Sequence, residues 1–161
     1  MTPQGYSRLQ IVLHWLTAAL LLVSFFSHEG MKASWRALSR GTEMTVTTGT
    51  MLHVWVGISI LALTVLRLAV RLTRGAPAAP EGGSKLLELL ARWAHWALYS
   101  VLLAIPFSGA MAWFVGVKQA AGTHEILFTI GWILVALHTA AALFHQLVLK
   151  DNLMQRMKRP G

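Results

Sequence analysis

The chain of 161 residues contains no cysteine and only six acidic residues. Without cysteine it cannot form disulfide bonds, thiolate metal sites, iron–sulfur clusters or a CxxCH motif for covalent cofactor attachment. Charged residues of both signs make up 12% of the chain, which is about half the usual fraction. Because a soluble domain of this length could not bury so much apolar surface, the composition predicts a single-domain membrane protein.

Basic residues outnumber acidic ones by fourteen to six, which gives a formal net charge of +8. The Lys and Arg residues stand at the ends of apolar runs rather than on one face of a soluble domain. Nucleic-acid binding is therefore not expected. The first apolar run is not closed by a small-residue cleavage pattern, so a cleavable signal peptide is not expected either.

Hydrophobic residues make up 55% of the chain, and the mean hydropathy is +0.56. About twenty apolar residues are needed to cross a bilayer as a helix, and four segments meet that length. We expect crossings at about 9–27, 49–72, 93–115 and 124–149. A Pro/Gly-rich loop, RGAPAAPEGGS, joins the second crossing to the third, which Pro106 should kink. The short connections predict an all-α integral membrane four-helix bundle that forms one domain over residues 1–161.

The distribution of basic residues predicts the orientation of the chain in the membrane. Four of them, Lys32, Arg36, Arg40 and Lys118, fall on one side. Ten fall on the other side, namely Arg8, Arg67, Arg71, Arg74, Lys85, Arg92, Lys150, Arg156, Lys158 and Arg159. The positive-inside rule then places both termini and the Pro/Gly-rich loop in the cytoplasm, with loops at about 29–48 and 116–123 outside.

Histidine is the polar residue that stands out in these apolar segments. His28 is predicted to lie in the first outer loop. The other six lie in or at the edge of a crossing, at His14, His53, His95, His124, His138 and His145. A single histidine in a membrane helix more often forms a hydrogen bond between helices, but several at matching depths indicate a functional site.

The positions of these histidines suggest two pairs. His53 and His124 lie at the outer ends of the second and fourth crossings and can face each other. His138 lies about 21 Å further along the fourth helix, on nearly the same face. His14, near the inner end of the first helix, can meet His138 if the helices tilt, although by depth His145 is also a good partner for it.

Two separated imidazole pairs suit haem better than zinc, because zinc requires four ligands around one point. Haem supplies four nitrogens of its own and requires only two axial ligands. The spacing therefore predicts two haems, one near each membrane surface. Gly57 would let the flat macrocycle approach the second helix, or it serves close helix packing. Arg67 and Arg71 either pair with propionates of the inner haem or only follow the positive-inside rule.

The chain resembles the bacterial cytochrome b561 family of di-haem, four-helix cytochromes of the inner membrane. The resemblance covers nearly the whole chain and is carried by YSRLQIVLHW, LHVWVGISILALTVLRLAVRL, HWALYSVLLAIPFSG and THEILFTIGWILVALHTAAALFHQLVLKDN. It implies haem b held by His14 with His138 and by His53 with His124. It also implies electron transfer between a donor and a quinone, and in some members superoxide is oxidised while ubiquinone is reduced.

Several alternatives stay open on the sequence alone. His95 and His145 either adjoin an inner quinone pocket or serve as packing and hydrogen-bonding groups. The outer loop before the fourth crossing is shorter than in the superoxide-oxidising relatives, which leaves the outer donor open. A second candidate function is a haem-bearing membrane anchor that accepts electrons from a soluble dehydrogenase or hydrogenase. A His-lined proton or metal transporter is the third, although no Asp or Glu lies deep within a crossing.

Overall fold

A computed structural model describes residues 5–77, 84–151 and 153–161 of the chain. Its four long helices are α1 (Arg8–Arg40), α2 (Thr48–Arg74), α3 (Lys85–Val115) and α4 (Lys118–Phe144). A π-helix, η1 (His145–Leu149), and a 3₁₀ helix, η2 (Leu153–Met157), follow. No strand occurs in these ranges, and each long helix is long and apolar enough to cross a membrane. The predicted all-α transmembrane bundle is confirmed.

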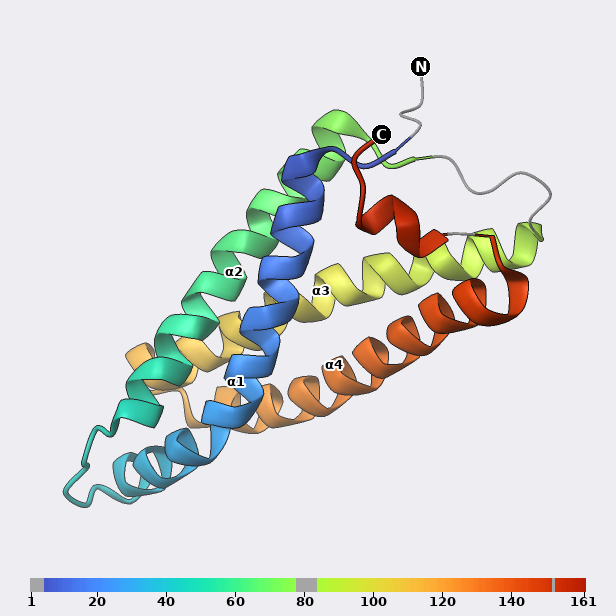
Figure 1. The fold of residues 1–161 in the computed structure, drawn as a ribbon. Coiled ribbons are helices and arrows are strands. Elements are labelled where there is room, and N and C mark those ends of the chain that lie inside the picture. The colour runs from blue at the N-terminus through green and yellow to red at the C-terminus, as the bar shows by residue number, and fades with distance from the viewer. Residues whose placement is uncertain (1–4, 78–83, 152) are drawn as a thin grey trace.

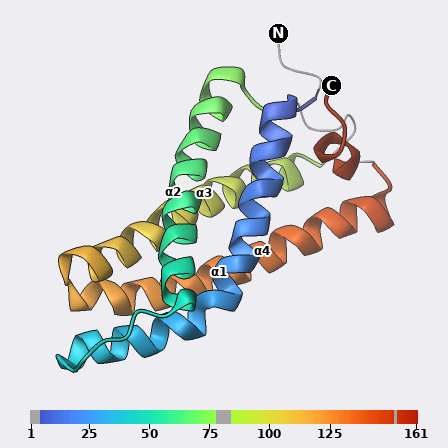
Figure 2. The same ribbon diagram turned by 60° about the vertical axis from the view of Figure 1, so that its left-hand side comes forward.

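The four helices are arranged as two antiparallel pairs. The pair α1 and α2 crosses the pair α3 and α4 at a wide angle (Figures 1 and 2). Both chain termini lie at one end of the molecule, and the connections within each pair lie at the other end (Figure 1). Most of the loop RGAPAAPEGGS, predicted between α2 and α3, lies outside the described residues.

Local sequence signals define the ends of the first helix. Ser7 Oγ accepts a hydrogen bond from the Gln10 backbone amide, and the Gln10 side chain accepts one from the Ser7 amide at 2.9 Å. This reciprocal capping box satisfies amides that have no partner within the helix. Gly41 ends α1 with a φ of 66°, a left-handed conformation that glycine adopts without strain.

The first helix is longer than predicted. It continues to Arg40, so His28 lies within α1 rather than in an outer loop, and residues 29–40 are helical. The last part of α1 turns away from the direction of the rest (Figures 1 and 2). A Cβ on Gly30 would lie 3.1 Å from the Gly49 Cα, so the two helix backbones approach closely there. The predicted end of the crossing near residue 27 was wrong because the polar residues that follow end the apolar run without ending the helix.

The interior contains small polar side chains, and large apolar side chains cover the outside. The most deeply buried side chains are those of Thr17, Thr50 and Thr64, each at most 1% exposed. By contrast, Phe26 is 79% exposed and Trp55 is 62% exposed. Helices in lipid pack through small residues because apolar side chains gain nothing by leaving an apolar solvent. Apolar residues such as Ile60 and Leu102 are buried as well, so it is the large apolar side chains on the outside that indicate a surface facing lipid.

Candidate functional site

The structure brings the four predicted ligand histidines together in two pairs. The ring centres of His53 in α2 and His124 in α4 are 6.3 Å apart. Those of His14 in α1 and His138 in α4 are also 6.3 Å apart. A metal ion bonded to one nitrogen of each of two imidazoles, at about 2 Å from each, separates the ring centres by about 6 Å. Both pairs therefore have the spacing of two axial ligands on one iron.

Backbone carbonyls orient both rings of the pair His53 and His124, which we call the outer pair; His14 and His138 form the inner pair. His53 Nδ1 lies 3.2 Å from the carbonyl oxygen of Ser24, and His124 Nδ1 lies 2.7 Å from that of Ile105. A carbonyl oxygen can only accept, so each Nδ1 carries the proton and donates it. The other ring nitrogen then keeps a free lone pair, and this tautomer is the one that binds a metal through Nε2.

An open cavity of about 590 Å³ adjoins the outer pair. The cavity is lined by His53, His124 and Gly57 together with apolar side chains of all four helices. A Cβ added to Gly57 would meet nothing within 4 Å, so helix packing does not require a glycine there. Gly57 instead leaves room on the cavity wall, and the residues present fit a flat apolar group such as haem.

Gly109 is a residue of this site that sequence reasoning missed. A Cβ on Gly109 would lie 3.0 Å from the His124 ring, so the missing side chain lets that ring lie against α3. Ser108 Oγ shares the Ile105 carbonyl with His124 and donates to it at 2.8 Å. The sequence signal for this contact is the pair of small residues, Ser108 and Gly109, shortly after Pro106 in IPFSG. Only the proline gave rise to a prediction from the sequence.

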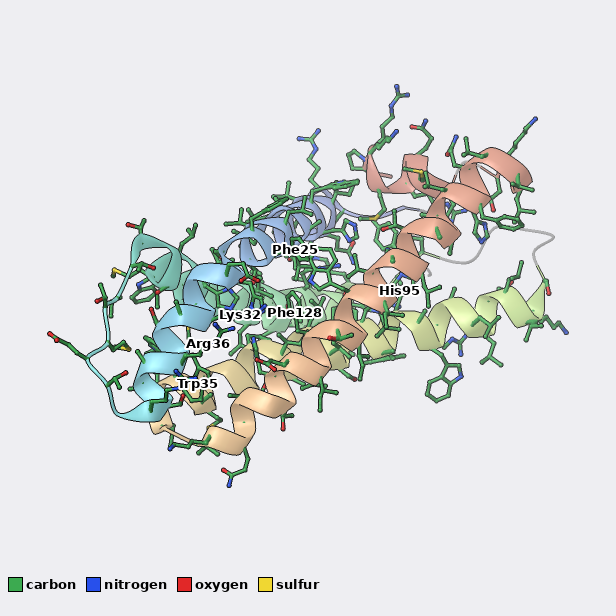
Figure 3. All side chains as sticks on the ribbon, turned by 90° about the horizontal axis from the view of Figure 1, so that it is seen from below. Phe25, Lys32, Trp35, Arg36, His95 and Phe128 are labelled. Carbon is green, nitrogen blue, oxygen red and sulfur yellow. The ribbon has the colours of Figure 1, made fainter. Side chains whose placement is uncertain are left out.

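His28 is a second residue that the sequence did not place in the site. Its ring stacks on Phe128 with centres 4.9 Å apart and lies 5.7 Å from the His53 ring. Its buried Nδ1 has no hydrogen-bond partner among the described residues. His28 lines a cavity of about 720 Å³ with Lys32 and Trp35, next to the outer pair. Figure 3 shows Lys32, Trp35 and Arg36 along the last part of α1, far from His95.

The inner pair has a different environment, because a cation contacts one of its rings. Arg67 Nη2 lies 3.1 Å from His14 Nδ1. The guanidinium carbons of Arg67 and Arg71 lie 5.6 and 5.8 Å from the centre of the Tyr99 ring, within the range of cation–π attraction. Charged residues within membrane-spanning helices are costly and usually serve a function. Arg67 lies two turns inside the end of α2, so its position indicates a role at this site.

The remaining two histidines, His95 in α3 and His145 in η1, differ in what they contact. The His95 ring lies 5.4 Å from that of His138, and its Nδ1 lies 2.6 Å from the Ala91 carbonyl oxygen. His145 Nδ1 contacts the Asp151 carboxylate instead of approaching His14. His145 matched His14 by depth, but the wide crossing angle of the helix pairs brings His14 to His138.

Comparison with known proteins identifies the family. The sequence matches the profile of prokaryotic cytochrome b561 over residues 5–160. The chain belongs to the prokaryotic cytochrome b561 family. It is 38% identical to cytochrome b562 of Cereibacter sphaeroides over 156 residues, covering 97% of this chain and 96% of the relative. It is 30% identical to the probable superoxide oxidase CybB of Yersinia pestis, covering 94% of each chain. It is 27% identical to cytochrome b561 homolog 1 of Escherichia coli, covering 94% of this chain.

As a member of the b561 family, this protein is a membrane electron-transfer cytochrome that carries haem b. Its four apolar helices make it a multi-pass protein of the bacterial inner membrane, in contact with lipid. The apolar cavity and the Nδ1–H tautomers at the outer pair suit this cofactor, as does the ring spacing of both histidine pairs.

Proposed function

We propose that this cytochrome transfers electrons through two haems b, held by His53 with His124 and by His14 with His138. The observation that carries the proposal is the ring-centre distance of 6.3 Å, shared by two pairs at different positions along α4. The haems supply one-electron redox chemistry when bound. The protein supplies the axial imidazoles, the apolar wall around Gly57, and the cations Arg67 and Arg71 near the inner site.

With an imidazole on each side of the iron, no position would remain for a substrate to bind the metal. The histidine pairs would hold the haems, and electron exchange with a substrate would be outer-sphere. The second cavity reaches the outer pair past His28, Lys32 and Trp35, which gives a small donor a route to that site. His28, Lys32 and Trp35 would position the donor and exclude bulk water without forming a covalent bond to the donor.

We further propose that superoxide is the donor and ubiquinone the acceptor, which makes the protein an oxidoreductase. Two superoxide ions lose one electron each and become dioxygen, and one ubiquinone gains two electrons and two protons to become ubiquinol. The proposal is supported by the relative named a probable superoxide oxidase. The outer cations Lys32, Arg36, Arg40 and Lys118 favour an anion, although Lys32 is paired with Glu29 at 2.9 Å. His95 and His145 are the proposed neighbours of the quinone at the inner end.

Haem content tests the ligand assignment. Purified wild-type protein is expected to show a low-spin b-type spectrum and two haems per chain. Replacing either His124→Ala or His138→Ala should remove one haem, because each iron loses one of its two ligands. His145→Ala, in η1 directly after α4, is the matched control and should keep both. Two haems in His138→Ala, or one in His145→Ala, would reassign the inner ligand.

A quinone-reduction assay tests the substrates. Protein in liposomes with ubiquinone is expected to form ubiquinol when superoxide is generated outside, and superoxide dismutase should abolish the reaction. Lys32→Glu with Arg36→Glu should lower the rate several-fold at low ionic strength and less at high salt, since screening weakens attraction of the anion. A di-haem protein that shows no superoxide-dependent quinone reduction would retain the electron-transfer role but exclude this donor.

A further inference from the structure

The Nδ1 atoms of the proposed ligands meet opposite chemistry at the two sites. At the outer site, both His53 Nδ1 and His124 Nδ1 lie against carbonyl oxygens, which only accept hydrogen bonds. At the inner site, His14 Nδ1 lies 3.1 Å from the Arg67 guanidinium, which only donates. The first arrangement increases electron density on the ring, whereas the second withdraws it.

Donation from Nδ1–H to a carbonyl makes an imidazole more basic and a stronger electron donor to the metal bonded at Nε2. A stronger donor stabilises the oxidised iron, which carries one more positive charge than the reduced iron. Both rings of the outer pair have such a partner, at 3.2 and 2.7 Å. The charges nearest this site are partly balanced, because Lys32 pairs with Glu29 and the adjoining cavity is also lined by Glu125.

Charge at the inner end is not balanced in this way. Arg67 contacts His14, and Arg71 lies against the same Tyr99 ring as Arg67. Within residues 5–77, 84–151 and 153–161, neither arginine pairs with a carboxylate. A positive charge in a medium of low dielectric constant favours the state of the neighbouring iron that carries less positive charge, which is the reduced state.

The carbonyl partners therefore lower the potential of the outer site, and the arginine charge raises that of the inner site. We infer that Arg67 gives the inner haem site the higher reduction potential, while the Ser24 and Ile105 carbonyls keep the outer site low. The inference rests on the proposed pairing of ligands. It makes Arg67 a positioning residue whose charge would set the direction of electron transfer, because an electron would be held more tightly at the inner site.

The same geometry requires Arg67 to adjust when the inner site is filled. A ring that accepts at Nδ1 carries its proton on Nε2, the nitrogen that the iron needs. A neutral His14 can bind iron through Nε2 only if its proton lies on Nδ1, so Arg67 has to move off Nδ1, towards a haem carboxylate. Its guanidinium charge then stays beside the inner site and raises the potential there through charge.

Potentiometric titration of the purified protein, followed by visible absorbance, tests the inference. The wild type should show two midpoint potentials. His138→Ala, which retains only the outer haem, should titrate close to the lower of them. Arg67→Gln should lower the higher midpoint and leave the other unchanged, and Arg67→Lys should shift it less. Arg74→Gln removes the same charge from the exposed end of α2 and should move neither midpoint.

The outcomes separate this inference from the proposed function. Fewer than two haems in the wild type would overturn the ligand pairing itself. Two haems whose midpoints do not respond to Arg67→Gln would overturn only the role of Arg67. If Arg67→Gln loses its inner haem, the comparison of His138→Ala with wild type still decides the order. A single remaining haem at the higher wild-type midpoint would contradict the inference.

Discussion

At the residue scale, two glycines contribute to the outer site for different reasons. Gly109 leaves room for the His124 ring, since a Cβ there would lie 3.0 Å from it. A Cβ at Gly57 would meet no protein atom within 4 Å, although Gly57 lines the same cavity as His53. Protein packing alone therefore explains Gly109 but not Gly57, whose open side faces the volume that we assign to haem.

A larger side chain at Gly57 tests whether this residue lies against the haem or serves helix packing. Gly57→Leu is expected to leave membrane insertion and helix content unchanged and to reduce haem content from two per chain towards one. Gly122→Leu is the control, because a Cβ at Gly122 also meets nothing within 4 Å but Gly122 lines neither cavity described above. Haem content is measured per chain together with circular dichroism. Full haem content in Gly57→Leu would show that this side of α2 does not contact the macrocycle.

Sequence reasoning found the histidines but could not find what orients them. An imidazole in an apolar helix is conspicuous, because burying a polar group in lipid requires a partner or a function. The partners of His53 and His124, however, are backbone carbonyls of Ser24 and Ile105. Every residue has such a carbonyl, so no pattern of side chains marks these two. The contact between Arg67 and His14 likewise depends on how α1 meets α2 in space.

At the element scale, the C-terminal segment folds back onto the start of α1. Trp15 Nε1 donates to the Met157 carbonyl at 2.8 Å, and the Gly161 amide donates to the Tyr6 carbonyl at 3.3 Å. The sequence predicted only that this tail leaves the membrane. It gave no sign of the return, because bonds between residues more than 140 positions apart leave no periodic pattern.

Asp151 connects this segment to the end of α4. Its carboxylate contacts His145 Nδ1 and accepts a hydrogen bond from the Leu153 amide at 3.1 Å. Burial alone would raise the pKa of Asp151, but the hydrogen bonds from His145 and Leu153 outweigh it and hold the pKa below its ordinary value. A carboxyl group with a lowered pKa stabilises the folded state above its unfolded pKa of about 3.9, and this stabilisation is lost as the pH falls through the lowered value.

We therefore expect the C-terminal segment to be held at neutral pH and to loosen in acid below about pH 4. Asp151→Asn should loosen it at neutral pH, with amide hydrogen exchange in residues 153–157 about fivefold faster. That factor corresponds to about 1 kcal/mol, the usual contribution of one hydrogen bond. Exchange rates corrected for intrinsic pH dependence give the measurement. If the variant and wild type exchange equally at pH 7, Asp151 does not hold the segment.

At the scale of the whole molecule, the two ends differ in charge as well as in connectivity. The end with both termini contains Arg71 and Arg74 of α2 and the basic C-terminal segment. The opposite end contains the α1–α2 and α3–α4 connections, with Lys118 donating to the Ser39 carbonyl across them at 3.1 Å. An even number of crossings puts both termini on one side, and the excess of basic residues predicts that this side is the cytoplasm.

The absence of cysteine makes this orientation directly testable, because one introduced cysteine is the only thiol in the chain. Thr42→Cys lies in the α1–α2 connection and Gln155→Cys in η2, and both positions are exposed. In intact spheroplasts a membrane-impermeant maleimide should label Thr42→Cys, and it should label Gln155→Cys only after permeabilisation. The reverse pattern would place Arg67 near the outer surface. The direction that we assign to electron transfer would then be inverted with respect to the membrane, although the order of the two potentials would be unchanged.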